Sequence, residues 1–256
     1  MSRRNRITPN WFDGVAAHYT LLFPLVKDKA LCCNRTPNQL RNHLVLAERG
    51  GNWYTPPMQT KPLFIVISAP SGCGKSTLCD MLLQHYNDLS YSVSCTTREP
   101  RGMEEDGVDY HFHTLERFRE LIDENAFLEY AEVHGNFYGT LKAPIAEDLA
   151  SGLSIVMDID VQGAAKVREH VKALPASDPM RDGFVDIFIM PPSMEELRRR
   201  LEGRSTDAPE VIERRLENAE GEIARADEFM FKVVNDELSV AFKRICDILD
   251  VKSGRM

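Results

Sequence analysis

The sequence predicts an α/β fold with a mostly parallel sheet flanked by helices. Two observations predict it. From Lys61 onward, short apolar segments alternate with longer segments of amphipathic helical period, which is typical of a parallel sheet covered on both faces. In addition, a glycine-rich loop at residues 69–76 joins the first apolar segment directly to the first helical segment. At 256 residues the chain is long enough for one α/β domain with small inserted lobes.

The individual elements follow from period and length. Apolar runs of strand length predict main-sheet strands at residues 62–68, 153–159, 184–190 and 230–234. Amphipathic periodicity predicts helices at residues 75–86, 114–124, 142–151, 161–172, 193–203, 208–227 and 237–249. The segment 90–140 is richer in Thr, Arg, Tyr and Gly, and it is predicted to form a smaller lobe of short strands inserted into the larger fold.

Residues 1–59 differ from the rest of the chain. Prolines and tryptophans interrupt short apolar patches there, and no sustained helical or alternating period appears. We expect an irregular, disordered extension, or an over-long start with the working protein beginning near Met58. Arg3, Arg4 and Arg6 precede the first acid and could indicate a transit peptide, but no clean amphipathic Arg/Ser helix follows them.

The charge distribution excludes several classes of protein. The formal net charge is −8, but residues 1–59 hold eight Lys and Arg against three Asp and Glu, so the remainder carries −13. This acidic body argues against broad electrostatic binding to nucleic acid, which depends on clustered Lys and Arg. No segment approaches the roughly 18 apolar residues that a membrane helix needs, so no membrane span is expected.

The cysteines indicate a reducing, cytoplasmic setting. They form no CxxC pair and no His/Cys spacing suited to zinc, and the chain is too large to need disulfides. They are Cys32, Cys33, Cys73, Cys79, Cys95 and Cys246. Cys73 lies inside the glycine-rich loop, where we interpret it as a small filler residue.

The loop at residues 69–76 has the context that phosphate binding requires, because a buried-looking strand precedes it and a helical pattern follows. Its glycines let successive backbone N–H groups point inward, and the positive end of the new helix adds to the attraction. Lys75 is expected to neutralise the β- and γ-phosphates of a nucleoside triphosphate, and Ser76 to place its hydroxyl on Mg²⁺. The usual first glycine of the motif is Ala69 here. The expected contacts are Ala69, Pro70, Ser71, Gly72, Cys73, Gly74, Lys75, Ser76 and Thr77.

A second phosphate site is predicted in residues 94–112. Arg98 and Arg101 lie three positions apart, and Pro100 stiffens the turn between them. Arginine forks suit a phosphate that must be held in place through a reaction, so a monophosphate acceptor fits this clamp. Taken alone, the segment could equally be a solvated surface turn whose arginines pair with neighbouring glutamates.

The same segment carries a family resemblance. Residues 94–112 match the pattern S-x-T-T-R-x-P-R followed by E, G and Y-x-F, and the sequence here closely resembles the guanylate kinase family. Residues 127–140 look like the family's guanine-reading segment, and residues 155–163 look like its second nucleotide motif. The resemblance implies a P-loop kinase fold over residues 60–256. Its parts would be a core (61–93, 141–193 and 229–256), an inserted mixed GMP-binding lobe (94–140) and a helical lid (194–228).

The resemblance implies ATP as the nucleotide in the loop and GMP as the acceptor. The residues expected to hold the GMP phosphate are Arg98, Arg101, Tyr110 and Tyr138. The residues expected to read its base are Glu129, Ser94, Thr140 and Asp158. Guanine presents N1–H and N2–H side by side, and one carboxylate such as Glu129 can accept both, whereas adenine offers an acceptor at N1. A solvated acid on a strand edge is the alternative for Glu129.

Lid and metal residues are implied in the same way. Arg204 and Arg215 are expected to close over the ATP phosphates and to act in catalysis with Lys75 and Arg98. The family's residues just after Arg204 differ here, which leaves a charged helix face as the alternative. Asn235 resembles the position that contacts adenine. Asp160, at the carboxyl end of a strand, is expected to hold Mg²⁺ through water.

The expected reaction is in-line transfer of the terminal phosphate of ATP to GMP, giving ADP and GDP, with Mg²⁺ and with closure of the lobes to exclude water. Two rivals stay open: a catalytically silent guanylate-kinase-like binding module, and a related P-loop kinase with another phosphorylated acceptor. Lys75 and Ser76 argue against the first, and Glu129 argues against the second. The sequence leaves monomer and homodimer open. Residues 173–183, longer than the family's usual link, are expected to be a surface loop without catalytic meaning.

Overall fold

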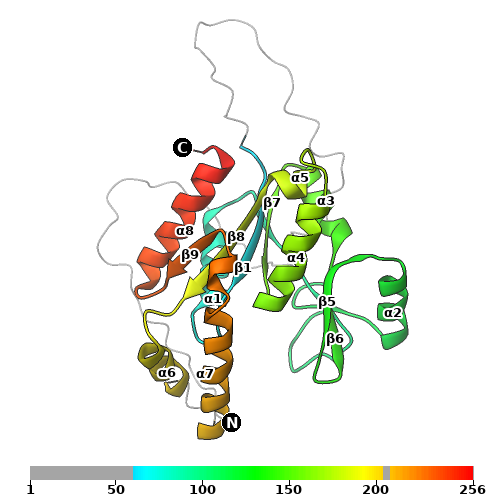
Figure 1. Ribbon diagram of the computed structural model, residues 1–256. Coiled ribbons are helices and arrows are strands. Elements are labelled where there is room, and N and C mark those ends of the chain that lie inside the picture. The colour runs from blue at the N-terminus through cyan, green and yellow to red at the C-terminus, as the bar shows by residue number, and fades with distance from the viewer. Residues whose placement is uncertain (1–59, 204–207, 256) are drawn as a thin grey trace, which may run out of the picture. The chain divides into compact units, whose positions relative to one another are not determined.

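The computed structural model describes residues 60–203 and 208–255 (Figure 1). These residues belong to one compact unit. The expectations for residues 1–59 and for Arg204 lie outside the described residues.

A five-stranded parallel sheet forms the centre of the fold, in the order β2-β7-β1-β8-β9 (Figure 1). The strands are β1 (Phe64–Ser68), β2 (Leu89–Tyr91), β7 (Ser154–Asp158), β8 (Phe184–Met190) and β9 (Phe231–Val234). The four predicted strands are confirmed, and β2 adds a short edge strand that the sequence did not reveal. Because all five strands are parallel, their carboxyl ends share one edge of the sheet, where α/β folds bind ligands.

The sheet has a hydrophobic core on each face. Ile65 and Ile67 of β1 pack into one core, whereas Phe64 and Val66 pack into the other, as strand alternation requires. The helices of the first core include α1 (Lys75–His85) and α8 (Leu238–Ser253). The helices of the second core include α3 (Lys142–Ala150), α4 (Val161–Ala173) and α5 (Pro179–Asp182). The predicted α/β class, a mostly parallel sheet flanked by helices, is confirmed.

A second, mixed sheet lies beside the first, in the order β4-β3-β6-β5 (Figure 1). Its strands are β3 (Cys95–Thr96), β4 (His111–Phe112), β5 (Phe127–Val133) and β6 (Asn136–Leu141). Helix α2 (Leu115–Asp123) packs on it through Phe118, whose ring stacks on Phe127 at 4.4 Å between centroids. The strands all fall in or directly beside the segment for which short strands were predicted.

Two helices at the predicted lid pack against the phosphate loop side of the core. They are α6 (Met194–Glu202) and α7 (Pro209–Ile223). Ser193 starts α6 by accepting a hydrogen bond from the Glu196 backbone N–H, and a proline opens α7 at a position where its missing N–H costs nothing. The single helix predicted at 208–227 is wrong at its end, because α7 stops at Ile223 and a 3₁₀ turn (Ala226–Glu228) follows.

The prediction of a plain surface loop at residues 173–183 is also wrong. Its second half forms the short helix α5, which Asp178 caps by accepting from the Met180 N–H. The Met180 side chain is only 6% exposed and belongs to the second core. The segment therefore helps to cover the sheet.

One buried ion pair ties α4 to the sheet. Asp186 of β8 is fully buried, and its carboxylate accepts from Arg168 Nη1 at 3.0 Å and from the Met230 N–H at 2.8 Å.

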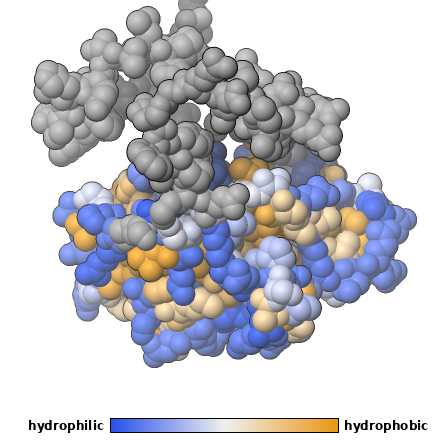
Figure 2. Space-filling model, turned by 90° about the horizontal axis from the view of Figure 1, so that it is seen from above, coloured by the Kyte–Doolittle hydropathy of each residue, from blue (hydrophilic) through white to orange (hydrophobic). Residues whose placement is uncertain are grey.

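Hydrophilic residues predominate on the described surface seen in Figure 2, with small hydrophobic areas between them. Over residues 60–203 and 208–255, no helix is long and apolar enough to cross a membrane.

Candidate active site

The loop between β1 and α1 curls through two glycines with left-handed backbone. Gly72 has a φ of +92° and Gly74 a φ of +82°, which other residues adopt only with strain. Space is also lacking, because a Cβ at Gly72 would lie 3.0 Å from Leu201 Cδ2 and one at Gly74 would lie 2.7 Å from Asn235 Nδ2. Lys75 and Ser76 open α1 directly behind this loop, as a phosphate-binding loop requires.

Asn235, which is buried, and Arg200, which is partly exposed, hold the loop in shape. Asn235, 5% exposed, donates its amide N–H to the Cys73 carbonyl oxygen at 2.8 Å. The Asn235 backbone carbonyl in turn accepts from Arg200 of α6 at 2.9 Å, so Asn235 connects the lid helix α6 to the phosphate loop. Burial raises the pKa of Cys73 to about 12, so its thiol stays protonated. Cys73 is thus a packing residue in this loop.

Lys75 reaches across to the carboxyl end of β7. Its ammonium lies 3.4 Å from Asp158 Oδ2, and the hydroxyl of Tyr91 on β2 donates to Asp158 Oδ1. Burial, with the neighbouring carboxylate, raises the pKa of Tyr91 well above its usual range. The phosphate loop and the edge strand therefore meet at one carboxylate.

A cavity of about 550 Å³ opens between the second sheet and the start of α4. Six of the residues that line it were singled out from the sequence: Ser94, Tyr110, Glu129, Tyr138, Asp158 and Asp160. They come from both sheets and are scattered along the sequence, so only folding brings them together. The volume is within the usual range for small-molecule sites, about 300–1,000 Å³.

Glu129 lies on β5, is partly exposed, and lines the cavity opposite the start of α4. Its Oε1 accepts from the Thr140 hydroxyl at 2.9 Å, and a Cβ at Gly163 in α4 would lie 3.5 Å from its Oε2. Burial raises the pKa of Glu129, the Thr140 hydrogen bond and Lys166 oppose that rise, and the negative charge of Asp160 adds to it. The Glu129 carboxylate is therefore hydrogen-bonded and partly exposed, on the edge strand β5 of the second sheet.

The two arginines of residues 94–112 differ. Arg98 is 8% exposed and forks onto Glu104, with Nη1 and Nη2 at 2.9 Å and 3.0 Å from the two carboxylate oxygens. Its guanidinium also lies 5.2 Å from the ring centre of Tyr110, a residue of the cavity. Arg101 is exposed, and its backbone N–H donates to the same Glu104 at 2.7 Å. One glutamate thus organises the turn that carries both arginines.

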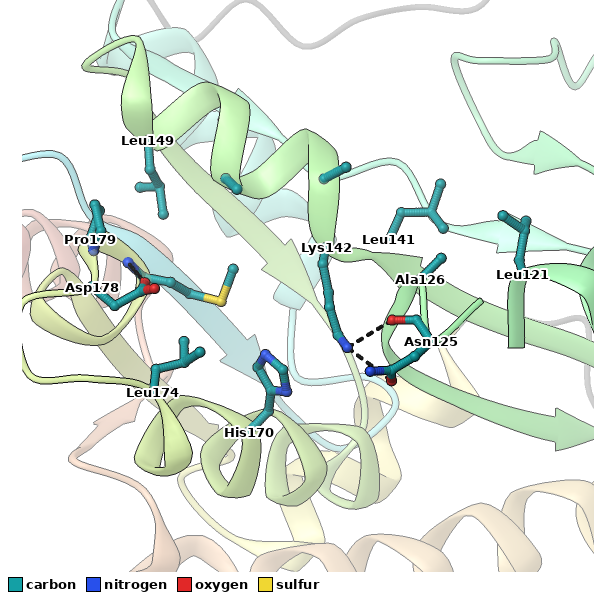
Figure 3. Close-up of a pocket in the computed structure, with 13 residues that line it drawn as sticks. Leu121, Asn125, Ala126, Leu141, Lys142, Leu149, His170, Leu174, Asp178 and Pro179 are labelled. Atoms are coloured by element: carbon teal, nitrogen blue, oxygen red, sulfur yellow. Dashed lines mark hydrogen bonds between the residues drawn. The ribbon is translucent and has the colours of Figure 1, made fainter. Parts of the chain in front are cut away.

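A further cavity of about 530 Å³ is lined by none of the predicted site residues (Figure 3). Its walls are mostly apolar, from α3, α4, α5, the end of α2 with the turn that follows it, and the end of β6. Figure 3 shows Lys142 reaching to Asn125, whose backbone and side-chain oxygens accept at 2.9 Å and 3.1 Å. His170 and Asp178 also line it, so positive and negative groups are both present. No catalytic or ligand-binding residue predicted from the sequence lines this cavity.

Comparison with known proteins decides the family. A model of the family described as guanylate kinase matches residues 60–252. The chain belongs to the guanylate kinase family. It is 49% identical over 176 residues to guanylate kinase of Dechloromonas aromatica, covering 69% of this chain and 82% of that protein. It is 42% identical over 192 residues to the enzyme of Geobacter metallireducens, covering 75% and 90%.

A solved structure agrees with this assignment. The crystal structure of guanylate kinase from Anaplasma phagocytophilum superposes with a TM-score of 0.58 at 35% identity, covering 76% of this chain and 87% of that one. Membership of the guanylate kinase family accounts for the phosphate loop and the second sheet together. It also makes the chain an enzyme of the kinase class.

The remaining site residues expected from the guanylate kinase resemblance are placed less directly. Arg215 lies on α7, partly buried, and Arg204 lies outside the described residues. Asp160 caps α4, because its Oδ1 accepts from the Gly163 N–H at 2.7 Å. In the described part of the chain, no group of three or more His, Cys, Asp and Glu is arranged to hold a metal ion.

Two residues of the site were not found from the sequence. Tyr91 ends a strand too short to recognise, and only the structure places its hydroxyl on Asp158. Glu222 of α7 lines a cavity of about 480 Å³ together with Asp160. Burial and the charge of Asp160 raise the pKa of Glu222, and Lys75 opposes the rise. No sequence signal separated Glu222 from the other charged residues of its helix.

Proposed function

We propose that ATP binds over the loop at Lys75 and that GMP binds in the cavity between Glu129 and Tyr110. As a member of the guanylate kinase family, the chain transfers the terminal phosphate of ATP to GMP, giving ADP and GDP. The observation that carries the residue assignment is the convergence of Glu129, Tyr138 and Asp158 on one cavity, with Asp158 also contacting Lys75.

Recognition of the base would come from Glu129. Its two oxygens can accept the N1–H and N2–H of guanine, while the Thr140 hydroxyl fixes the carboxylate from behind. Adenine would set a lone pair against this buried carboxylate and leave it unsatisfied, which is a costly mismatch. Asp158 and Ser94 line the same cavity and would complete the contacts to the base.

The phosphate of GMP would be held from the other end of the cavity. Tyr110 and Tyr138 line it, and the Arg98 guanidinium lies over the Tyr110 ring. The Glu104 fork and the Glu99 carbonyl fix the Arg98 guanidinium beside Tyr110, and its remaining N–H groups would be available to the phosphate of GMP. Arg101 is exposed on the neighbouring turn and would join when the lobes close.

The chemistry requires alignment and charge neutralisation, without a covalent intermediate on the protein. Lys75, Arg98, Arg204 and Arg215 would stabilise the charge of the phosphate in transfer. Bound Mg²⁺ would neutralise phosphate charge and orient the phosphates. The residues present suit it, since Ser76 offers an exposed hydroxyl in the first turn of α1 and Asp160 offers an oxygen ligand through water. Closure of the smaller sheet over the core would exclude water, and small-angle scattering should show contraction when both nucleotides are bound.

The cysteines of the described residues fit a reducing compartment. The four cysteines within the described residues are free and buried. We propose a cytoplasmic enzyme on this ground.

A comparison of acceptors tests the base-reading assignment. In a coupled assay with ATP, GMP should be phosphorylated with a kcat/KM at least about a hundredfold above that of AMP, UMP or dTMP, because none of these bases presents the two adjacent donors of guanine: adenine has an acceptor at N1, and uracil and thymine have one N3–H donor flanked by two acceptors. A kcat/KM for AMP equal to that for GMP would contradict it. Absence of turnover with every acceptor would instead favour the silent binding module.

A further inference from the structure

Tyr91 lies outside the expected site, but its side chain touches Asp158, a residue of that site. It lies at the end of the edge strand β2, paired in parallel with Val156 of β7. The next residue continues this pairing, since the Ser92 N–H donates to the Val156 carbonyl at 2.9 Å. The parallel register carries the Tyr91 ring toward the carboxyl end of β7, where its hydroxyl meets Asp158.

The two oxygens of Asp158 have different partners. Oδ1 accepts from the Tyr91 hydroxyl, and Oδ2 faces the Lys75 ammonium at 3.4 Å. Lys75 is needed by the phosphates when ATP is bound, and its attraction to Asp158 then weakens. The neutral hydroxyl of Tyr91 is not drawn to phosphate in this way, so it can keep the carboxylate in place throughout.

We infer that Tyr91 is a positioning residue for acceptor recognition, which holds Asp158 so that its carboxylate serves the exocyclic amine of guanine. The inference rests on the proposed function, because it assumes that GMP occupies the cavity lined by Asp158 and Glu129. Tyr91 does not line that cavity and acts through Asp158 alone.

Inosine monophosphate is the probe that isolates this effect. Its base keeps the N1–H of guanine but lacks the exocyclic amine. Tyr91→Phe removes one hydroxyl and leaves the ring in place. The kcat/KM for GMP should fall about five- to twentyfold, as expected for a hydrogen bond to a charged group that is partly exposed, while the value for inosine monophosphate should change less than about twofold. The KM for ATP should stay the same.

Tyr130 offers a matched control. It is 40% exposed, against 39% for Tyr91, and its hydroxyl donates no hydrogen bond within the described residues. Tyr130→Phe should leave the kcat/KM values for both acceptors unchanged. In an Asp158→Asn background, Tyr91→Phe should cause little further loss, because its partner has already been changed.

The outcomes separate this inference from the proposed function. Wild-type protein that does not prefer GMP over inosine monophosphate would overturn the base-reading assignment itself. A preserved preference in wild type, with equal losses for both acceptors in Tyr91→Phe, would overturn the role of Tyr91 alone and leave it a structural residue. No change with either acceptor would overturn it as well.

Discussion

Gly74 is a position where both the backbone conformation and the available space require glycine. At its φ of +82°, a side chain costs about 1–2 kcal/mol. The new Cβ of Gly74→Ala would also lie 2.7 Å from Asn235 Nδ2, so the amide would turn away and lose its hydrogen bond to the buried Cys73 carbonyl. A buried polar group left unsatisfied costs about 1–3 kcal/mol. The free energy of unfolding should therefore fall by about 2–5 kcal/mol.

Gly152 separates the two contributions. It has a φ of +87°, but a Cβ there would meet nothing within 4 Å. In urea unfolding, Gly152→Ala should cost only the backbone part, about 1–2 kcal/mol. Isothermal titration with a non-hydrolysable ATP analogue should show affinity lowered at least about tenfold in Gly74→Ala and unchanged in Gly152→Ala, since 1.4 kcal/mol is a factor of ten.

Asn235 provides an internal check on the predicted clash at Gly74. Asn235→Ala removes the group that the new methyl would strike. Gly74→Ala and Asn235→Ala should therefore cost less together than the sum of their separate losses. Equal unfolding free energies for Gly74→Ala and Gly152→Ala, with normal ATP affinity in both, would refute the idea that Asn235 shapes the loop.

Three further predictions concern other parts of the fold. The kcat/KM for GMP should fall as pH decreases through the raised pKa of Glu129, above the ordinary range of a glutamate, because only the carboxylate accepts both guanine donors. In Glu129→Gln, the kcat/KM for GMP should no longer fall on the acid side, and it should be about a hundredfold lower than the wild-type value at neutral pH. Asp186→Ala should lower the free energy of unfolding by about 3–5 kcal/mol in urea, because Arg168 loses its buried partner and keeps only Glu228, whose side chain is 42% exposed, and because the Met230 N–H loses its acceptor; a loss below about 1 kcal/mol would contradict this. Met180→Ala should lower the free energy of unfolding by about 2–4 kcal/mol, and an unchanged free energy would support the original prediction that residues 173–183 are a surface loop.

Much of the fold could be predicted because its signals are local. The strand, loop and helix at residues 62–86 carry apolar period, glycines and a lysine in fixed order, and the structure reproduces them within a few residues. The edge strand β2 was missed because its three residues, two half-buried and one exposed, have no recognisable period. Helix α5 was missed because four residues give no amphipathic pattern, and only tertiary packing buries Met180.

The site was predictable where residues carry their own chemistry. Arg98 and Glu129 could be singled out by residue type and by motif, and Glu129 indeed lines the cavity. The hydroxyl of Tyr91 and the amide of Asn235 act through partners 67 and 162 positions away along the chain. Such pairings depend on the register of parallel strands and on the path of the chain between them, which the sequence alone did not reveal.

A structure of the protein with GMP and a non-hydrolysable ATP analogue would test the central claim most directly. The account predicts both Glu129 carboxylate oxygens within hydrogen-bond distance of guanine N1 and N2. It also predicts the GMP phosphate beside Arg98 and Tyr138, facing the γ-phosphate held at Lys75. A guanine bound elsewhere, with the Glu129 carboxylate still occupied only by Thr140, would contradict it.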